Sequence, residues 1–319
     1  MVFDSQEIIR LGVVNNLKII ADIVEHKKSI SRAIKKYGYF AEHNYMHYLY
    51  NESGLNKNIV FDFGCDKVIL SQLNKKNNVW SLFPNGILAP ESERLDLLFE
   101  ATNYILKKQK VKKFVVEVSE DIRNNIIKKI KKRGGFKACN VNYILYWPVY
   151  DMNLWSPKLK GRQWKKLRNI RNQFYKNKKV QIRDSKDISK EELSRILFSW
   201  LKKRSNTARV KTDYYLNLIN NDFKGFDMAK TICVNGKPST ITAGWKIPNT
   251  NNYYSSIGIL DYSYPGLGEV ANIDDLNRLK RQGFDHVDFG GSEKALLYFK
   301  KKFRPEKIYK TYIFSIVRR

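Results

Sequence analysis

The order of secondary-structure elements predicted from the 319-residue sequence occurs twice, and this repeat limits the fold more than any other feature. In each half, three short strand-like runs are followed by a helix, a strand, a second helix and a closing strand. The closing segments also share a layout, with GFKACNVNYILYWPV in the first half and FRPEKIYKTYIFSIV in the second. Solenoid repeats are far shorter than this. The pattern therefore predicts two similar domains, residues 1–155 and 156–319.

In the first half, the residues ahead of the repeated elements, roughly the first 55, are predicted to be largely helical. Pro90 and two acidic residues then open an amphipathic helix, and Gly134 ends the next one. The strands of this half are expected at 58–63, 67–73, 79–83, 113–118 and 141–150.

The second half is predicted to start with a basic helix over 162–176 and a strand over 180–183. Ser189 and Glu192 form a capping-box pattern at the start of the next helix. The repeated elements follow, as strands at 228–234, 239–247, 252–259, 286–290 and 308–317 and helices at 268–282 and 296–301.

Three antiparallel strands followed by a crossover into a parallel pair give a mixed sheet with helices on both faces. The predicted fold class is therefore α/β in the broad sense, an α+β mixed sheet present in tandem. This element order resembles the fold of the GCN5-related N-acetyltransferases, the GNAT or acyl-CoA N-acyltransferase fold.

Two segments narrow the resemblance. The segment 159–177 reads LKGRQWKKLRNIRNQFYKN, and the segment 283–309 reads GFDHVDFGGSEKALLYFKKKFRPEKIY. Both are similar to the C-terminal domain of phosphatidylglycerol lysyltransferases, the aminoacyl-phosphatidylglycerol synthases, and more distantly to the FemABX peptidyltransferases. The resemblance implies an acyltransferase. Its donor would be aminoacyl-tRNA or acyl-CoA, and its acceptor an amine or hydroxyl of a small molecule, peptide or lipid.

The charge of the chain agrees with a polyanionic partner such as tRNA. Lys and Arg number 59 against 31 Asp and Glu, so the formal net charge is 59 − 31 = +28. Residues 158–183 carry eleven Lys and Arg and no acid. Excess positive charge attracts polyanions, although solvated lysine-rich helix faces also occur without a partner.

The basic helix has two kinds of face. Trp164, Leu167, Ile170 and Phe174 recur at helical spacing and are expected to face the core. Cations cover the remaining faces and would position a phosphate backbone without reading its bases. The residues assigned to this role are Lys166, Arg168 and Arg171.

The best candidate for the catalytic segment is GGSEKALLYFKKKFRP. Gly290 and Gly291 allow close approach of the backbone to a ligand at the end of a strand. Ser292 is expected either to cap the next helix or to donate to a carbonyl oxygen. Glu293 or Asp288 is assigned the removal of a proton from the acceptor.

Three cations of the same segment alternate along it. If the segment is extended, Lys300, Lys302 and Arg304 point to one side, where they would bind a phosphate or stabilise an oxyanion. We assign Lys302 and Lys300 to catalysis and Arg304 to donor binding. The alternative is a solvated corner between a helix and a strand.

The sequence leaves the two donors open. Enzymes of this fold that use acyl-CoA hold its pyrophosphate on a glycine-rich loop at a helix N-terminus. In DYSYPGLGEVAN, Gly266 and Gly268 fit that loop, but Ser263 stands where Gln or Arg is expected. The first half has no such loop. No cofactor beyond the donor substrate is predicted.

The remaining signals concern metals and location. His43 and His47 are spaced as in helical metal pairs but lack the glutamate of HExxH and a third ligand, so no metal ligand is assigned. Cys65, Cys139 and Cys233 form no CxxC pair, which indicates a reducing compartment. The start of the chain is unlike a secretory signal, and no run reaches the ~18 apolar residues of a membrane span. We expect a cytoplasmic protein, with peripheral membrane contact left open.

Three functions follow in order of preference. The first is a soluble aminoacyltransferase that moves an aminoacyl group from aminoacyl-tRNA to an amine or hydroxyl. The second is an acyl-CoA-dependent N-acyltransferase. The third is a GNAT-like protein that binds nucleic acid without catalysis.

Overall fold

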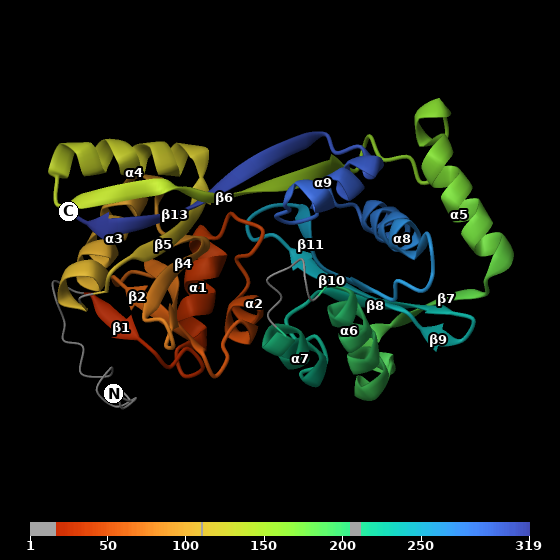
Figure 1. Cartoon of the computed structure of the whole chain (residues 1–319), viewed down its shortest axis with the longest axis horizontal. Helices are drawn as coiled ribbons and strands as arrows, with labels where there is room; N and C mark the ends of the chain where they lie inside the picture. Colours follow the sequence, from red (N-terminus) through yellow and green to blue (C-terminus); the bar gives the residue numbers. More distant parts are fainter. Residues whose placement is uncertain (1–16, 110, 205–211) are drawn as a thin grey trace. The chain divides into compact units, whose positions relative to one another are not determined.

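A computed structural model describes residues 17–109, 111–204 and 212–319 (Figure 1). The chain divides into two compact units. The first unit comprises residues 1–145 and 310–319, and the second comprises residues 146–309. The sequence placed the division at 155/156, with the C-terminal strand in the second domain. In the structure the C-terminal residues belong to the first unit.

The first unit contains a mixed sheet in which β2, β3 and β4 form an antiparallel meander, and β5 lies parallel to β4. This is the order that the sequence predicted. The described elements are β1 (Lys18–Ile20), α1 (Lys27–Tyr37), α2 (Tyr45–Tyr50), β2 (Asn56–Asp62), β3 (Val68–Asn74), β4 (Val79–Leu88), α3 (Glu91–Asn103), β5 (Phe114–Ser119), α4 (Glu120–Arg133) and β6 (Phe136–Asp151).

Helices cover both faces of this sheet because its strands alternate their apolar side chains. In β2, Ile59 and Phe61 pack in one cluster with apolar residues of α3 and α4. Val60, between them, packs in a second cluster with residues of α1 and α2. Side chains of successive residues point to opposite faces of a strand, so one strand supplies both cores.

The helical prediction for the N-terminal region is partly wrong. Lys18–Ile20 form the strand β1, which pairs antiparallel with β2 (Lys18↔Asp62 to Ile20↔Val60). The predicted helical residues that precede position 17 lie outside the described part of the chain.

The second unit repeats the order of the first. Strands β8, β10 and β11 form the meander, and β12 lies parallel to β11. Figure 1 shows α8 and α9 on one side of this sheet and α6 and α7 on the other. The described elements are α5 (Lys165–Asn177), β7 (Val180–Asp184), α6 (Lys190–Arg204), α7 (Thr212–Asn220), β8 (Met228–Val234), β9 (Lys237–Pro238), β10 (Thr240–Lys246), β11 (Asn252–Leu260), α8 (Leu267–Arg281), β12 (His286–Asp288), α9 (Lys294–Lys300) and β13 (Lys307–Arg318).

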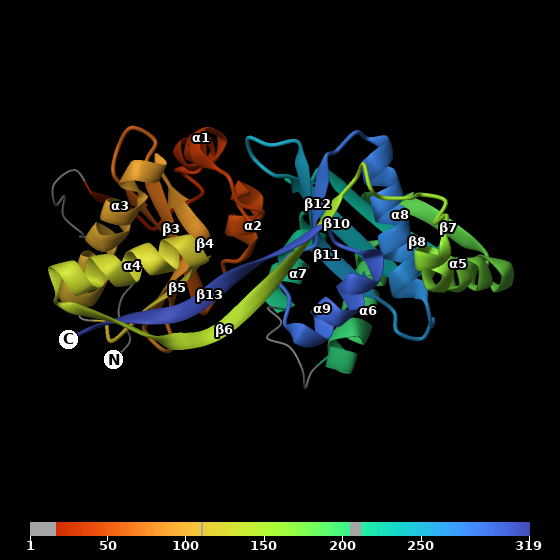
Figure 2. The same ribbon diagram turned by 90° about the horizontal axis from the view of Figure 1, so that it is seen from above.

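The closing strands β6 and β13 run through both units (Figure 2). The last residues of β6, Val149–Asp151, pair with β12 in the second unit. The C-terminal part of β13, Thr311–Ile316, pairs with β5 in the first unit. Each repeat is therefore completed by the closing strand of the other half.

The two parallel strands of the second unit part after a short pairing. β11 and β12 pair only from Asn252↔His286 to Tyr254↔Asp288, whereas β11 continues to Leu260. Beyond Asp288 the chain follows β6 instead, since Ser292 and Tyr146 exchange two backbone hydrogen bonds of 2.9 Å. The sequence predicted a strand through residue 290, but β12 ends at Asp288.

Candidate active site

Asp288 is the last residue of β12 and is buried, with 4% of its surface exposed. Its carboxylate accepts hydrogen bonds from the Tyr309 hydroxyl at 2.6 Å and from the Gly290 N–H at 2.7 Å. Burial disfavours the charged form and raises the pKa of Asp288 to about 6, although both hydrogen bonds act in the opposite direction. A buried carboxyl group that titrates near neutrality therefore lies where the parallel strands part.

Lys300, the last residue of α9, reaches the same segment. Its ammonium group donates to the carbonyl oxygens of Phe289 and of Gly290, the latter at 3.1 Å. Surrounding protein disfavours the ammonium form and lowers the pKa of Lys300 to about 7, against the opposing charge of Asp288. The structure thus brings together Lys300 and Asp288, which the sequence singled out separately.

Two features hold the backbone between these residues. Gly290 has a φ of +76°, and a Cβ at this position would lie 3.1 Å from the ring and hydroxyl of Tyr254. Ser292 is buried, and its hydroxyl donates to the Gly290 carbonyl at 3.2 Å. The Ser292 hydroxyl, assigned from the sequence to a substrate carbonyl, is therefore engaged by the turn itself. Gly291 lies between these two residues.

The other predicted residues of this segment point to different places. Residues 294–303 are helical rather than extended, so the three cations do not share one side. The Lys302 ammonium donates to Glu269 of α8 at 2.8 Å and lies 4.9 Å from the centre of the Phe299 ring. Glu293 is exposed at the start of α9. The guanidinium of Arg304 lies 5.8 Å from the centre of the Trp164 ring.

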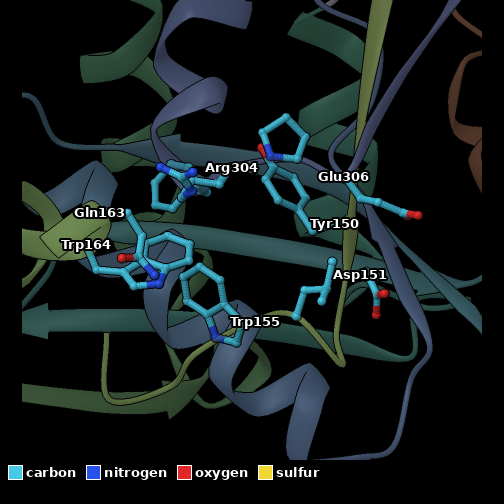
Figure 3. A pocket seen from close by; sticks show the side chains of 10 residues that line it. Tyr150, Asp151, Trp155, Gln163, Trp164, Arg304 and Glu306 are labelled. Atoms are coloured by element: carbon cyan, nitrogen blue, oxygen red, sulfur yellow. The ribbon is translucent and has the colours of Figure 1, made fainter. Parts of the chain in front are cut away.

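Arg304 lines a pocket of about 450 Å³ within the second unit. Figure 3 shows its aromatic rings around Arg304, with the carboxyl groups of Asp151 and Glu306 together on the side opposite Trp164. The lining residues are Tyr150, Asp151, Leu154, Trp155, Gln163, Trp164, Phe303, Arg304, Pro305 and Glu306.

Tyr150 connects this pocket with the buried pair. Its ring lines the pocket, and its hydroxyl donates to the Lys300 carbonyl at 2.8 Å. Its ring also lies 4.4 Å, between centres, from that of Phe289. The sequence did not indicate a role for Tyr150, because Tyr150 looks like any other apolar residue of the strand predicted over 141–150. Tyr309 and Glu306 were within the quoted motif, but nothing in their spacing marked them.

The cations of the basic helix differ in what they contact. The Arg168 guanidinium donates to the carbonyl oxygens of Leu159 at 2.5 Å and Gly161 at 3.1 Å. Arg171 donates to the Pro157 carbonyl at 3.3 Å. Both arginines therefore hold the loop ahead of α5, whereas Lys166 is exposed.

The predicted core face of this helix is confirmed. Trp164, Leu167 and Phe174 are buried, and Ile170 is half-buried.

The N-terminus of α8, where the CoA pyrophosphate would bind, is covered. Side-chain atoms of Ile170 and Phe174 lie 3.0 and 3.7 Å from where a Cβ of Gly266 would stand. Glu269 occupies the first turn of α8 and pairs with Lys302. Ser263 donates to the carboxylate of Asp261. Apolar side chains and a carboxylate at this place disfavour an anion.

The histidines noted in the sequence have other roles. His43 is buried, its Nδ1 accepts the Tyr39 N–H at 3.1 Å, and its Nε2 donates to the Asn85 carbonyl at 3.2 Å. Burial lowers the pKa of His43 to about 3, which keeps the ring neutral. His47 lies 4.0 Å from Glu42. No helix in the described part of the chain is long and apolar enough to cross a membrane.

Comparison with known proteins identifies the fold of the chain. No protein-family model and no curated protein sequence matches the chain. The C-terminal domain of a putative lysylphosphatidylglycerol synthetase from Agrobacterium fabrum matches with a TM-score of 0.65 at 13% identity, over 92% of this chain and 91% of that one. A tandem GNAT protein from the clavulanic acid biosynthesis pathway matches with a TM-score of 0.56 at 9% identity, over 95% and 98%.

FemX matches with a TM-score of 0.54 at 12% identity, over 96% of each chain. These matches confirm the resemblance that the two sequence segments predicted. At such low identities they show the fold alone, and the chain has a tandem GNAT fold with a mixed α/β architecture.

Proposed function

We propose that this chain is an acyltransferase that moves an aminoacyl group from aminoacyl-tRNA to an amine or hydroxyl of a small molecule, peptide or lipid. The observation that carries the proposal is the placement of Asp288 and Lys300, which both contact the backbone at Gly290, with Tyr150 linking the Lys300 carbonyl to the pocket. Burial moves the pKa values of both groups toward neutrality, to about 6 and about 7. A group transfers protons most efficiently when its pKa is close to the working pH. Acyl transfer to an amine or hydroxyl requires such a group, because the acceptor loses a proton when it attacks.

The proposed step balances as follows. The acceptor nitrogen or oxygen forms a bond to the carbonyl carbon of the aminoacyl ester, and the ester bond to the ribose oxygen breaks. The neutral Lys300 amine takes the proton that the acceptor loses, and the resulting Lys300 ammonium gives that proton to the ribose oxygen as it leaves. Asp288 favours the ammonium form of Lys300 between these two transfers. Lys302 and Glu293 keep their predicted catalytic roles only as predictions, since Lys302 pairs with Glu269.

The choice of donor is supported by two features of the second unit. The N-terminus of α8 is covered by apolar side chains of α5, which disfavours acyl-CoA. The pocket offers the exposed guanidinium of Arg304, which suits a phosphate. We assign the end of the tRNA to this pocket and its backbone to the exposed cations of α5, Lys166 first.

Binding measurements separate the candidate functions. Fluorescence anisotropy is used to titrate the chain with labelled aminoacyl-tRNA and with the same tRNA uncharged, and calorimetry is used for CoA. We expect tighter binding of the charged tRNA than of the uncharged one and weaker binding of both by Arg304→Ala. Tight binding of CoA without binding of tRNA would overturn the proposal in favour of an acyl-CoA-dependent enzyme. Equal binding of any RNA, with no transfer, would favour a non-catalytic binding protein.

A further inference from the structure

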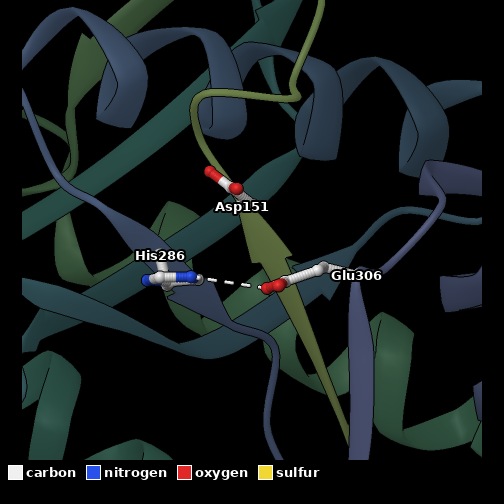
Figure 4. Close-up of side chains that lie close together, drawn as sticks. All are labelled: Asp151, His286 and Glu306. Carbon is white, nitrogen blue, oxygen red and sulfur yellow. Dashed lines mark ion pairs between the residues drawn. The ribbon is translucent and has the colours of Figure 1, made fainter.

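Three side chains of types that commonly ligate metals lie together at one end of the second unit's sheet (Figure 4). Asp151 ends β6, His286 begins β12, and Glu306 immediately precedes β13. The backbone fixes all three positions. His286 and Asp151 are directly paired in the antiparallel ladder of β12 and β6, and the Glu306 N–H donates to the Val149 carbonyl at 2.9 Å.

The spacing of the three groups suits one ion. One ligand atom from each residue lies within 4.8 Å of the other two, and His286 Nε2 is 3.4 Å from a Glu306 carboxylate oxygen. Ligand atoms around a tetrahedral Zn²⁺ with bonds of about 2.0–2.1 Å are about 3.3 Å apart. The His286 side chain is 29% exposed and that of Glu306 is 41% exposed, which leaves both room to rotate toward an ion.

The negative charges of Asp151 and Glu306 also favour a bound cation. Asp151 and Glu306 are two carboxylates beside one imidazole, in a chain with a formal net charge of +28. Despite that excess of Lys and Arg, neither carboxylate forms an ion pair with Lys or Arg within the described ranges. One oxygen of Asp151 is already held by the Asn153 N–H at 2.7 Å, which orients the carboxylate as outer contacts do in metal sites.

We propose that Asp151, His286 and Glu306 form a binding site for a divalent transition-metal ion of the Zn²⁺ class. Imidazole with two carboxylates is a ligand set that suits such ions, and three protein ligands leave a coordination position open. Two of the ligands also line the pocket, so the ion lies at its wall and the open position takes a water or an anionic oxygen of a bound molecule. The site goes beyond the proposed transfer reaction and does not depend on it.

The experiment measures the metal directly. The full chain is freed of metal with a chelator and titrated with Zn²⁺ by calorimetry, and with Co²⁺ by visible absorption. We expect one equivalent of either ion per chain, with the intense d–d bands of a four-coordinate Co²⁺ site. Glu306→Gln and His286→Ala are each expected to weaken binding at least about tenfold. Glu306 is exposed, so Glu306→Gln is expected to retain the fold, which circular dichroism verifies.

Cys65→Ser is the matched control, because Cys65 is an exposed free thiol and thus the strongest competing ligand on the surface. It is expected to bind the ion as the wild type does. The proposal is overturned if no equivalent binds, if binding persists unchanged in both ligand variants, or if Cys65→Ser abolishes it. If the wild-type chain binds the ion but transfers no amino acid, that result would count against the proposed function and not against the metal site.

Discussion

At the scale of single residues, the surroundings of Lys300 decide its chemistry. Its ammonium contacts two backbone carbonyls and is enclosed by protein, which lowers its pKa from 10.5 to about 7. The sequence showed a run of cations and no means of ranking them. Only the tertiary structure distinguishes Lys300, whose ammonium donates to two backbone carbonyls, from Lys302, which forms an ion pair with Glu269.

The lowered pKa of Lys300 predicts a pH dependence of stability. Between pH about 7 and 10.5 the unfolded chain holds a proton on this lysine that the folded chain releases. The contribution of Lys300 to the free energy of unfolding therefore rises with pH in this window, and the full penalty of burying the charge is present below pH 7. We expect the free energy of unfolding, measured by urea denaturation, to rise less between pH 7 and 9 in Lys300→Met than in the wild type.

Lys302→Met is the matched control, and its pH dependence is expected to follow that of the wild type. Equal slopes in wild type and Lys300→Met would show that the lysine is not enclosed as described. If the unfolding free energy of Lys302→Met no longer rose with pH, Lys302 and not Lys300 would be the lysine responsible for the pH dependence.

At the scale of elements, the cations of α5 fall into two groups that the sequence pattern does not separate. Its cations looked equivalent because the pattern separates only the apolar face from the rest. In the structure Arg168 and Arg171 donate to carbonyls of the preceding loop, whereas Lys166 is exposed. The apolar face was predictable, since periodicity records it. The loop contacts were not, because they depend on how the chain enters the helix.

The two kinds of cation predict separable effects. Arg168→Ala is expected to lower the free energy of unfolding by about 1 kcal/mol, because it removes hydrogen bonds to two carbonyl oxygens. Lys166→Ala is expected to change it by less than about 0.5 kcal/mol. It should instead lower the salt slope of tRNA binding by about 1. Urea denaturation and tRNA titrations over a series of KCl concentrations measure both. A salt slope that Lys166→Ala leaves unchanged would remove α5 from the tRNA surface.

Other elements show where local patterns fail. The repeated meander, crossover helix and parallel strand were predictable because each carries its own periodicity and turn residues. Lys18–Ile20 were not, since three residues form a strand only by pairing with β2. The early end of β12 also depends on a distant partner, because the chain leaves β11 to follow β6.

At the scale of the whole molecule, the closing strands mark the limit of sequence reasoning. The two closing segments share a layout, and that layout does not indicate which sheet each one joins. The sequence therefore predicted that each half ends in its own strand. In the structure, residues 149–151 pair with β12 and residues 311–316 pair with β5. The order of strands along a repeat can be predicted from the local sequence. The sheet that a closing strand joins depends on distant residues and cannot.

This exchange predicts the behaviour of separated halves. Residues 1–155 alone lack β13, the antiparallel partner of β5, and residues 156–319 alone lack the part of β6 that borders β12. We expect each fragment alone to be unfolded or aggregated because unpaired strand edges are exposed. Heteronuclear NMR spectra of each fragment, and of the two co-expressed, test this. A well-dispersed spectrum of either fragment by itself would contradict the exchange.

In the proposed function, aminoacyl transfer by this chain depends on Lys300. Its most direct test follows radiolabelled amino acid from aminoacyl-tRNA into a mixture of a small primary amine, a short peptide and phosphatidylglycerol vesicles, from pH 6 to 9. We expect transfer above the uncatalysed rate that rises with pH through about 7. We expect this transfer to be lost in Lys300→Arg, because arginine keeps the charge but does not release its proton. Transfer by Lys300→Arg at the wild-type rate and with the same pH profile would contradict it.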